Sequence, residues 1–502
     1  MKKSIFIYFL IYSCILSGLF IGIITTNQNA LFISDKTDTL NSVQLNSLGW
    51  SNYEIISDSK PPWNDGASSA PDIAVDSSGT VHVVWNDDTD GWWETDIEIM
   101  YSSYTPSSGW STPTIVSDTA TLWNNESSYL PSIAVGASGT VHIVWYDQTD
   151  GWWGTDTEIM YRNYTPNVGW SSPKIISDDI TQWNNKSSYC PDIAVDPSGN
   201  VHVVWYDETD GWWGIDTEIM YINYSPSSGW SSPIVISDDV SLWNNGSSYI
   251  PSITADSSGK IHVVWHDNTK GWWGTDFEIM YTCYTPGSGW TSPIVISDTA
   301  TLWNDGYSYF PVIAADNSGN LYVVWQDSTD GGWGTDDEIM FNSYTPSSGW
   351  GTPSVISDTG TNWNNASSGD PRIAVDTSGI VHVVWNDMTE GWWGTDDEIM
   401  YRNYSVSTGW NTITILSDNQ TKWNDKESFS PSIAVDSSNK VHIVWSDETD
   451  GWWGTDTEIM YLSYTPPPAP STGIPSFSLL YSFMAMVLLG ILMSLIKFRK
   501  HL

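Results

Sequence analysis

The stretch Val201–Tyr221, VHVVWYDETDGWWGIDTEIMY, recurs seven times along the chain at a fixed spacing of 60 residues. Its first tryptophan marks the seven copies, at Trp85, Trp145, Trp205, Trp265, Trp325, Trp385 and Trp445. No insertion or deletion separates the copies, which together span residues 48–465. A fixed period of this length indicates a repeat architecture in which each unit packs on its neighbours. The repeats therefore predict one domain, rather than the few ordinary domains that 502 residues suggest.

Each repeat contains four short strand signals. In the copy around residue 200 they are Asp192–Asp196, Val201–Tyr206, Glu218–Tyr224 and Trp230–Ser237. These segments are rich in Val, Ile, Trp and Tyr and are bounded by Gly, Pro, Ser, Asn and Asp, which is typical of strands. The repeats show no helical periodicity. Four antiparallel strands in each of seven units predict an all-β, seven-bladed β-propeller.

The two ends of the repeat region complement each other. The seventh copy ends after its third strand, Glu458–Tyr464, and a stretch with the fourth-strand pattern, Gly49–Asp58, precedes the first full copy. We expect this N-terminal strand to complete the last blade, because a closed ring leaves no exposed sheet edge.

The segments outside the repeats predict export and a membrane anchor. Residues 1–25 have the basic start and apolar run of a signal peptide or signal anchor, and residues 26–47 form a polar spacer. After the propeller, residues 466–476 form a Pro-rich linker and residues 477–496 an apolar segment long enough for a transmembrane helix. The basic tail 497–502 is then cytoplasmic and the propeller lies on the extracellular face of the cell membrane. The same ending resembles the sorting signals of microbial surface proteins, in which another anchor replaces the helix.

Composition restricts the partners. The chain has 59 acidic and 17 basic residues and a net charge of −42, which excludes nucleic-acid binding through phosphate neutralisation. The cysteines Cys14, Cys190 and Cys283 form neither a disulfide framework nor a metal-ligand pattern, so we expect isolated thiols. Eight sequons permit glycosylation of an exported protein: Asn125, Asn163, Asn185, Asn223, Asn245, Asn365, Asn403 and Asn419.

The unusual residues fall on one side of the predicted ring. In a propeller the first-to-second and third-to-fourth turns share one face, here called the turn face, and they consist of short Ser/Gly turns. The second-to-third loops and the connections between blades share the other face, here called the loop face. In the copy around residue 200 these segments are Asp207–Asp216 (DETDGWWGID) and Ser237–Pro251 (SDDVSLWNNGSSYIP). We expect the functional residues on the loop face.

Tryptophan and asparagine are the candidate ligand-binding residues of this face. An aromatic platform beside polar groups suits a sugar ring and its hydroxyls, whereas the alternative role of the tryptophans is packing on the blade. At least one tryptophan of each pair should be buried, because exposing all of them would favour aggregation. The candidates are Trp92, Trp93, Trp152, Trp153, Trp212, Trp213, Trp272, Trp273, Trp333, Trp392, Trp393, Trp452 and Trp453, with Asn64, Asn124, Asn184, Asn244, Asn304, Asn364 and Asn424.

Three roles are open for the repeated carboxylates. They can hold the loop by accepting backbone hydrogen bonds, bind calcium through hard oxygen ligands, or contact a ligand directly. Repetition in every blade favours the first role, and the spacing is not that of an EF-hand loop. The candidate calcium ligands are Asp87, Asp96, Asp147, Asp156, Asp207 and Asp216. The histidine of the second strand, such as His202, is replaced by Tyr322 in one copy, so we expect it to pack between strands.

The repeat resembles that of the sialidase-like, BNR-repeat propellers. The similar segments are PDIAVDPSGNVHVVWYDETDG (Pro191–Gly211) and EIMYINYSPSSGWSSP (Glu218–Pro233). The resemblance implies a propeller and a sugar-related function. The Asp-box of that family, S-x-D-x-G-x-x-W, is degenerate here, because Tyr224–Trp230 (YSPSSGW) keeps Gly-Trp but lacks the Asp. Sialidases also use three convergent arginines, whereas the propeller contains only Arg162, Arg372 and Arg402, so the resemblance assigns no catalytic residue.

These observations favour a non-catalytic binding or adhesion module. It would be monomeric, anchored in the membrane and specific for a glycan or a cell-surface protein, with calcium as an open question. The alternatives are a sialidase-like glycoside hydrolase and a surface-coat or spacer protein without a specific ligand. Near-identical blades offer no single pair of carboxylates of the kind that glycoside hydrolysis needs, so the sequence leans away from an enzyme without deciding the point.

Overall fold

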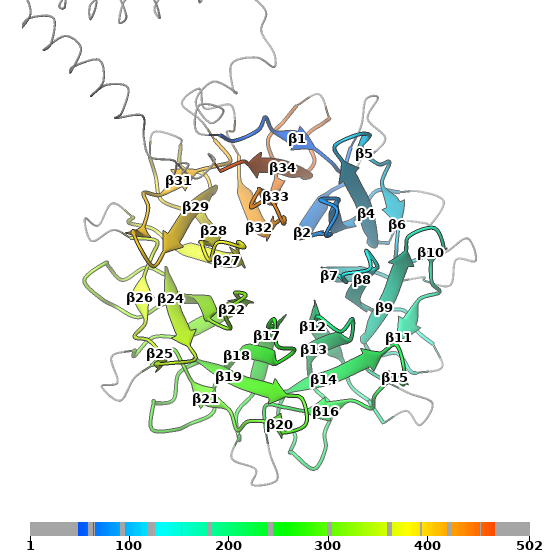
Figure 1. Ribbon diagram of the computed structural model, residues 1–502, viewed down its shortest axis with the longest axis vertical. Helices are drawn as coiled ribbons and strands as arrows, with labels where there is room; N and C mark the ends of the chain where they lie inside the picture. Colours follow the sequence, from blue (N-terminus) through cyan, green and yellow to red (C-terminus); the bar gives the residue numbers. More distant parts are fainter. Residues whose placement is uncertain are drawn as a thin grey trace, which may run out of the picture. The chain divides into compact units, whose positions relative to one another are not determined.

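The computed structural model describes residues 49–466, apart from 59–63, 65, 91–95, 119–123, 125, 152, 179–182, 239–243, 299–303, 359–363, 392–393, 419–423, 425 and 452. Seven antiparallel sheets surround a central axis (Figure 1). Neighbouring innermost strands are in contact around the ring, and the last of them, β32 (Ser428–Val435), contacts the first, β2 (Ser68–Val75). The predicted all-β, seven-bladed propeller is therefore confirmed.

The predicted segments at the two ends lie outside the described residues. These are the signal segment 1–25, the spacer 26–47, the linker beyond Pro466, the transmembrane helix 477–496 and the tail 497–502. Within the described part of the chain, no helix has the length and apolar character needed to cross a bilayer.

Each blade repeats the same strands from the axis outward. The innermost strands are β2 (Ser68–Val75), β7 (Ser128–Val135), β12 (Ser188–Val195), β17 (Ser248–Ala255), β22 (Ser308–Ala315), β27 (Ser368–Val375) and β32 (Ser428–Val435). The second strands are β3 (Val81–Asp87), β8 (Val141–Asp147), β13 (Val201–Asp207), β18 (Ile261–Asp267), β23 (Leu321–Asp327), β28 (Val381–Asp387) and β33 (Val441–Asp447). The third strands are β4 (Glu98–Thr105), β9 (Glu158–Thr165), β14 (Glu218–Ser225), β19 (Glu278–Thr285), β24 (Glu338–Thr345), β29 (Glu398–Ser405) and β34 (Glu458–Tyr464).

The outer strand of blades 1 to 6 consists of two short pieces. The first pieces are β5 (Gly109–Trp110), β10 (Gly169–Trp170), β15 (Gly229–Trp230), β20 (Gly289–Trp290), β25 (Gly349–Trp350) and β30 (Gly409–Trp410). The second pieces are β6 (Thr114–Ile115), β11 (Lys174–Ile175), β16 (Ile234–Val235), β21 (Ile294–Val295), β26 (Ser354–Val355) and β31 (Thr414–Ile415). Blade 1 thus runs from β2 to β6, and the following blades are numbered in chain order.

The break in the outer strand corrects the predicted continuous strand Trp230–Ser237. In blade 3, Tyr224 pairs with Trp230 and Met220 pairs with Val235, so the outer strand contains one more residue than β14 between the two pairings. Pro233 lies in this interval and has no N–H to donate to β14. The extra residue therefore forms a bulge and divides the strand.

The innermost strand also differs from its prediction, because β12 begins at Ser188 rather than Asp192. The register of β12 against β13 shifts between Tyr189 and Asp192. Cys190, directly before Pro191, has a φ of 49°. A left-handed residue followed by proline hides the first part of the strand from pattern analysis, since neither is typical of a regular strand.

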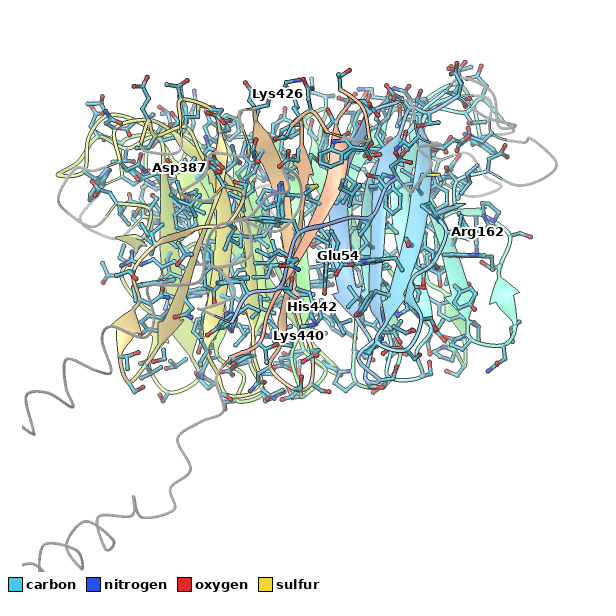
Figure 2. The ribbon with its side chains drawn as sticks, turned by 90° about the horizontal axis from the view of Figure 1, so that it is seen from above. Glu54, Arg162, Asp387, Lys426, Lys440 and His442 are labelled. Atoms are coloured by element: carbon cyan, nitrogen blue, oxygen red, sulfur yellow. The ribbon has the colours of Figure 1, made fainter. Side chains whose placement is uncertain are left out.

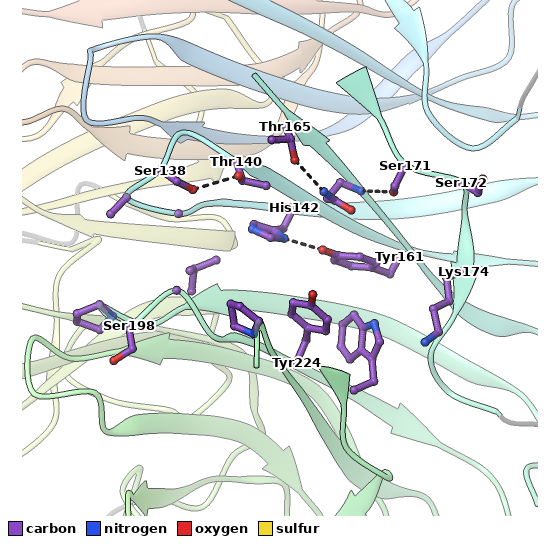
Figure 3. Close-up of a pocket in the computed structure, with 18 residues that line it drawn as sticks. Ser138, Thr140, His142, Tyr161, Thr165, Ser171, Ser172, Lys174, Ser198 and Tyr224 are labelled. Carbon is purple, nitrogen blue, oxygen red and sulfur yellow. Dashed lines mark hydrogen bonds between the residues drawn. The ribbon is translucent and has the colours of Figure 1, made fainter. Parts of the chain in front are cut away.

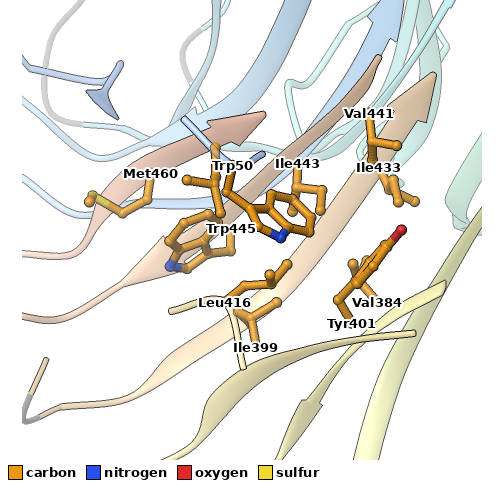
Figure 4. Packing of buried hydrophobic residues seen from close by; sticks show 11 residues of the cluster. Trp50, Val384, Ile399, Tyr401, Leu416, Ile433, Val441, Ile443, Trp445 and Met460 are labelled. Atoms are coloured by element: carbon orange, nitrogen blue, oxygen red, sulfur yellow. The ribbon is translucent and has the colours of Figure 1, made fainter. Parts of the chain in front are cut away.

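The apolar core lies between neighbouring blades. Each second strand contributes a tryptophan with no exposed surface, such as Trp205 or Trp445. Between blades 6 and 7, residues of β28 and β29, with Leu416 directly after β31, meet residues of β32, β33 and β34 around Trp445 (Figure 4). Trp50, from the N-terminal stretch, lies in the same cluster with 5% of its surface exposed. Its ring is 5.1 Å from that of Tyr401, at an angle of 86°.

The N-terminal stretch pairs with the last third strand. In β1 (Glu54–Ile55), Ile55 faces Met460 of β34, and Trp50 forms an isolated bridge with Tyr464. The same two kinds of pairing, Ile with Met and Trp with Tyr, join the outer strand to the third strand in blade 1. The order of strands in blade 7 is therefore β1-β34-β33-β32.

Candidate functional site

The two faces of the ring can be followed in a side view (Figure 2). Lys426 and Asp387 lie toward one end of the blades, whereas His442 and Lys440 lie toward the other. Lys426 belongs to the connection between blades 6 and 7, so its end is the loop face. Lys440 belongs to the hairpin between β32 and β33, so its end is the turn face.

The best-described tryptophan loop is that of blade 3. Gly211 and Gly214 each donate an N–H to the carbonyl of the other, at 3.0 and 3.2 Å, which puts Trp212 and Trp213 at the tip of a tight turn. A Cβ atom on Gly211 would lie 2.4 Å from the ring of Trp213, so glycine allows this ring to fold back. The Trp213 indole N–H donates to the carbonyl of Thr209 at 3.0 Å. Trp213 is therefore a fixed support within the loop.

Trp212 projects from that support. Its ring stands at 80° to the ring of Trp213, with the centroids 5.5 Å apart, and 55% of its surface is exposed. Blade 4 repeats this arrangement, with Trp272 57% exposed and Trp273 partly buried. One tryptophan of each fully described pair is thus partly buried, rather than buried as predicted, and the other is exposed.

The second tryptophan of the loop is held in the same way in three further blades. Trp153, Trp333 and Trp453 donate their indole N–H to a threonine carbonyl at 2.9 to 3.1 Å and are partly buried. In blade 5 Gly332 replaces the first tryptophan, and a Cβ atom there would have nothing within 4 Å. The other predicted tryptophans lie outside the described residues: Trp92, Trp93, Trp152, Trp392, Trp393 and Trp452.

The seven predicted asparagines lie beneath the surface, with exposed fractions of 0 to 2%: Asn64, Asn124, Asn184, Asn244, Asn304, Asn364 and Asn424. The amide nitrogen of Asn184 donates to Ser188 Oγ at 2.9 Å, to Asp207 Oδ2 at 3.2 Å and to Glu158 Oε2 of the preceding blade at 3.4 Å. Its amide oxygen accepts the hydroxyl hydrogen of Thr209. This placement connects two blades, and direct contact with a ligand would require the buried network to open.

The aspartate at the end of the second strand is also buried and accepts several hydrogen bonds. Asp207 Oδ2 accepts hydrogen bonds from the Trp205 indole at 2.9 Å and from the Ser188 hydroxyl at 2.8 Å, while Oδ1 accepts the Thr209 N–H at 2.8 Å. The tryptophan bond recurs in all seven blades. Burial raises the pKa of Asp207, as it does for Asp87 and Asp147. These contacts support the bracing role.

The calcium prediction finds no support in the described ranges of the chain. There, no group of three or more His, Cys, Asp or Glu side chains is placed to hold a metal ion. Among the six candidates, Asp87, Asp147 and Asp207 are 2% exposed and already accept hydrogen bonds. Asp96, Asp156 and Asp216 are partly buried in the loop before the third strand.

A buried glutamate opens each third strand. Glu218 has no exposed surface, and Ser237 donates a hydrogen bond of 2.5 Å to its Oε2 atom. Burial raises the pKa of Glu218 to about 9, and the nearby carboxylates of Asp216 and Asp238 act in the same direction. The pKa is about 9 for Glu98, Glu158, Glu278, Glu398 and Glu458, and about 8 for Glu338. These seven carboxyl groups are therefore protonated at neutral pH.

The histidines of the second strand pack between strands. His202 is 5% exposed, its Nδ1 is 2.7 Å from the Tyr221 hydroxyl, and its Nε2 is 3.6 Å from Asp196 Oδ2. In blade 5 Tyr322 occupies this position and donates to Asp316 Oδ2 at 3.3 Å. The packing role expected from the sequence agrees with these contacts.

The three arginines of the propeller lie in three different places and make separate contacts. Arg162 donates from Nη1 to the carbonyl of Val116 at 2.6 Å, which joins blade 2 to blade 1. Arg402 makes the equivalent bond to the carbonyl of Ile356 at 2.6 Å. Arg372 lies on the innermost strand β27 of blade 6. The arginines do not converge on a common site.

Sequence analysis missed a set of cavities between blades on the turn face. Their volumes are about 760 Å³ between blades 2 and 3, 310 Å³ between blades 3 and 4, and 520 Å³ between blades 4 and 5. In each, a His and a Tyr of one blade lie opposite a Tyr and a Trp of the next. One signal was present in the sequence, because Gly136 replaces the aspartate found in the other six copies.

Comparison with known proteins gives the fold a context. No protein-family model matches the sequence, and no curated protein does. The PL25 ulvan lyase bound to -[GlcA(1-4)Rha3S]- has a TM-score of 0.53 at 10% identity, over 79% of this chain and 94% of that chain. An unknown-function protein from Dyadobacter fermentans DSM 18053 has a TM-score of 0.47 at 9% identity, over 84% and 100% of the two chains. The NanB sialidase from Streptococcus pneumoniae has a TM-score of 0.41 at 11% identity, over 82% and 70%.

The similarity to the ulvan lyase shows the fold alone. The ulvan lyase is similar over most of its own length, so the propeller as a whole is shared rather than a single blade. Identities near 10% assign neither a substrate nor a site to this chain.

Proposed function

We propose that this protein is a cell-surface propeller that binds glycans without transforming them, through the outward tryptophans of its loop face. The observation that supports this most directly is the pair of exposed rings, Trp212 and Trp272, each held on a partly buried tryptophan. A large aromatic ring that is fixed and exposed offers a sugar an apolar platform at little cost in side-chain entropy. The side chains of Asn64 and its equivalents fix the connection from below.

Repetition supports binding rather than catalysis. Six of the seven copies contain the tryptophan pair, so a ring of weak and equivalent sites would gain strength by multivalent binding. The three arginines that a sialidase-like site would need are in separate contacts. A sialidase-like, BNR-repeat relationship remains part of the proposal, supported by the Gly-Trp of the third-to-fourth turn and the propeller fold. The ulvan lyase, which shares the fold, is bound to a saccharide.

The location is part of the same proposal. The signal segment 1–25 and the transmembrane helix 477–496 would hold a monomeric propeller on the extracellular face of the membrane, at the end of the linker 466–476. A surface position agrees with the net charge of −42, which keeps such a ring soluble and separate from its copies.

A glycan array tests the proposal. We propose that the first tryptophan of each loop pair faces outward, as Trp212 and Trp272 do. The full-length protein is compared with a variant in which the six tryptophans at this position are alanine: Trp92, Trp152, Trp212, Trp272, Trp392 and Trp452. We expect the wild type to bind a defined set of glycans and the variant to lose that binding without a change in unfolding temperature. The control replaces Val168 and Val406, which are 83% and 81% exposed, by alanine and should bind like the wild type. Equal binding by the tryptophan variant contradicts the proposal, and a parallel array with chelator tests for calcium.

A further inference from the structure

Of the three cavities described above, the largest lies between blades 2 and 3 on the turn face, with a volume of about 760 Å³ (Figure 3). We refer to it as the blade 2–3 groove. Blade 2 contributes the hairpin around Gly136, His142, Tyr161 and Lys174, and blade 3 contributes the turns that contain Tyr224 and Trp230. This volume falls in the range of small-molecule binding sites, about 300 to 1,000 Å³.

The groove differs from the cavities between blades 3 and 4 and between blades 4 and 5 by the absence of one aspartate. In blades 1, 3, 4, 6 and 7 an aspartate places its carboxylate 3.5 to 3.7 Å from the Nε2 atom of the histidine on the second strand. Blade 2 has Gly136 at this position. The hairpin keeps its backbone, since the Gly136 N–H donates to the Thr140 carbonyl at 2.9 Å, as Asp196 does to Asn200. The substitution therefore removes a side chain and leaves the turn in place.

The consequence for His142 is a change in its surroundings. The Nδ1 atom keeps its contact with the Tyr161 hydroxyl, at 2.7 Å. No carboxylate among the described residues pairs with the ring, and burial alone lowers the pKa of His142 to about 4. Its exposed fraction is 8%, against 1 to 5% for the equivalent histidines. A neutral imidazole thus lines the cavity with one nitrogen engaged by tyrosine and the other without an acidic partner.

A second substitution changes the charge of the same groove. Lys174, on β11, occupies a position that is Glu, Thr, Ile, Ile, Ser and Thr in the other copies. Its Nζ atom lies 5.7 Å from the ring centroid of Trp230. Among the described residues that line the groove, none is an Asp or Glu, whereas the smaller cavities include Asp196 and Asp256. The charged residue that lines the groove is therefore a lysine, in a protein whose net charge is −42.

The opposite wall provides aromatic surface and hydroxyl groups. Tyr224 and Trp230 are partly buried, with ring centroids 5.4 Å apart, and the Tyr224 hydroxyl points into the space between the walls (Figure 3). The hydroxyls of Ser138, Thr140 and Ser198 lie at the rim. Aromatic rings beside converging hydrogen-bonding groups suit a sugar ring.

We propose that the blade 2–3 groove binds an acidic sugar unit, with its carboxylate at Lys174, its ring against Tyr224 and Trp230, and a hydroxyl group at His142. The two substitutions that distinguish blade 2 act together, because loss of Asp removes a negative charge and gain of Lys adds a positive one. The site is separate from the outward tryptophans, which lie on the loop face.

The test measures binding of glucuronate and of glucose to the full-length protein by saturation-transfer NMR. The protein is produced in a host that does not glycosylate Asn163, which also lines the groove. We expect glucuronate to bind and glucose to bind more weakly. Gly136→Asp restores the pair found in the other blades, and an added Cβ meets no atom closer than 3.6 Å. We expect this variant and Lys174→Ile to weaken glucuronate binding by about tenfold or more.

Lys186→Ile is the matched control, because it removes a lysine that pairs with Asp210 on the loop face at 2.6 Å. It should bind glucuronate like the wild type. The reverse change, Asp256→Gly with Ile294→Lys in the groove between blades 4 and 5, should add a second site. The proposal is overturned if the wild type does not bind glucuronate, if glucose binds equally well, or if Gly136→Asp binds glucuronate unchanged. None of these outcomes depends on the outward tryptophans, so this inference and the proposed function can fail separately.

Discussion

At the scale of single residues, the loop after each second strand contains two kinds of residue: those that hydrogen-bond to the blade and those that are exposed. Asp207 and Trp213 are engaged with the blade, whereas Trp212 is exposed and Asp210 lies at the surface. Asp207 and Trp213 recur in all seven copies, whereas the Trp212 position is Gly332 in one copy and the Asp210 position is Lys270 or Glu390 in two others. The distinction comes from which hydrogen-bond partners are buried with each side chain.

Replacement of Asp207 by alanine should lower the free energy of unfolding by about 2 to 4 kcal/mol, because the Trp205 and Thr209 donors lose a buried acceptor. Asp210 offers the control, since its side chain is 50% exposed and its only described ion pair is with Lys186. Asp210→Ala should change the stability by less than about 1 kcal/mol. Urea unfolding measures both variants, and equal losses would mean that Asp207 is not a brace.

The asparagines show the limit of sequence analysis at this scale. An asparagine that follows a tryptophan in the sequence can bind a sugar hydroxyl or can be buried with its amide hydrogen-bonded inside the protein. Asn184 takes the buried role because its amide donates to Glu158 of the preceding blade and to Asp207 of the following strand. These partners come together only when the blades pack. No pattern within one repeat contains that contact.

At the scale of elements, the strand pattern predicted the blades well, except at the bulge in the outer strand and at the left-handed residue in the innermost strand. The outer strand breaks near Pro233, and the innermost strand begins before the bulge at Cys190. The seventh copy lacks an outer strand, and β1, within the stretch Gly49–Asp58, pairs with β34 at Glu54 and Ile55. Trp50 then adds a buried ring between blades 6 and 7.

Removal of residues 49–58 from the full chain should therefore lower the unfolding temperature and cause self-association. The deletion exposes the edge of β34 and removes Trp50, which is 5% exposed, from the core. Differential scanning calorimetry and light scattering measure the two effects. A deletion of equal length within the predicted spacer, residues 31–40, is the control. An unchanged temperature in a monomeric 49–58 deletion would show that the ring does not depend on this strand.

At the scale of the whole molecule, sevenfold repetition multiplies each local property. Seven glutamates with a raised pKa hold their protons in the folded state and release them near pH 4.5 when unfolded. Their contribution to stability is complete below pH 4.5 and is lost as the pH rises to about 9. Burial lowers the pKa of six histidines, which act in the opposite sense below pH 6.5: His82, His142, His202, His262, His266 and His442.

We therefore expect the free energy of unfolding to decrease between about pH 7 and pH 9, above the range in which the histidines titrate. Urea unfolding at a series of pH values measures this slope. Glu218→Gln removes one titrating group and should make the slope shallower. Stability that rises across this interval would contradict the protonated state of these carboxyl groups.

The predicted architecture was recoverable from sequence because seven copies repeat one pattern, whereas the cavities were not. A groove forms from one hairpin of each of two neighbouring blades, so its walls are visible only when the ring is assembled. Gly136 and Lys174 are ordinary surface substitutions until the structure places them in the same groove.

The most direct test of the account is the affinity of the full-length protein for an immobilised glycan as the outward tryptophans are removed in steps. Variants with six, four, two and no outward tryptophans are measured by surface plasmon resonance on a glycan found by the array. The account predicts that binding weakens at each step and is lost when none remains, because the affinity is multivalent. Affinity that stays at the wild-type level in the variant without outward tryptophans would contradict the account.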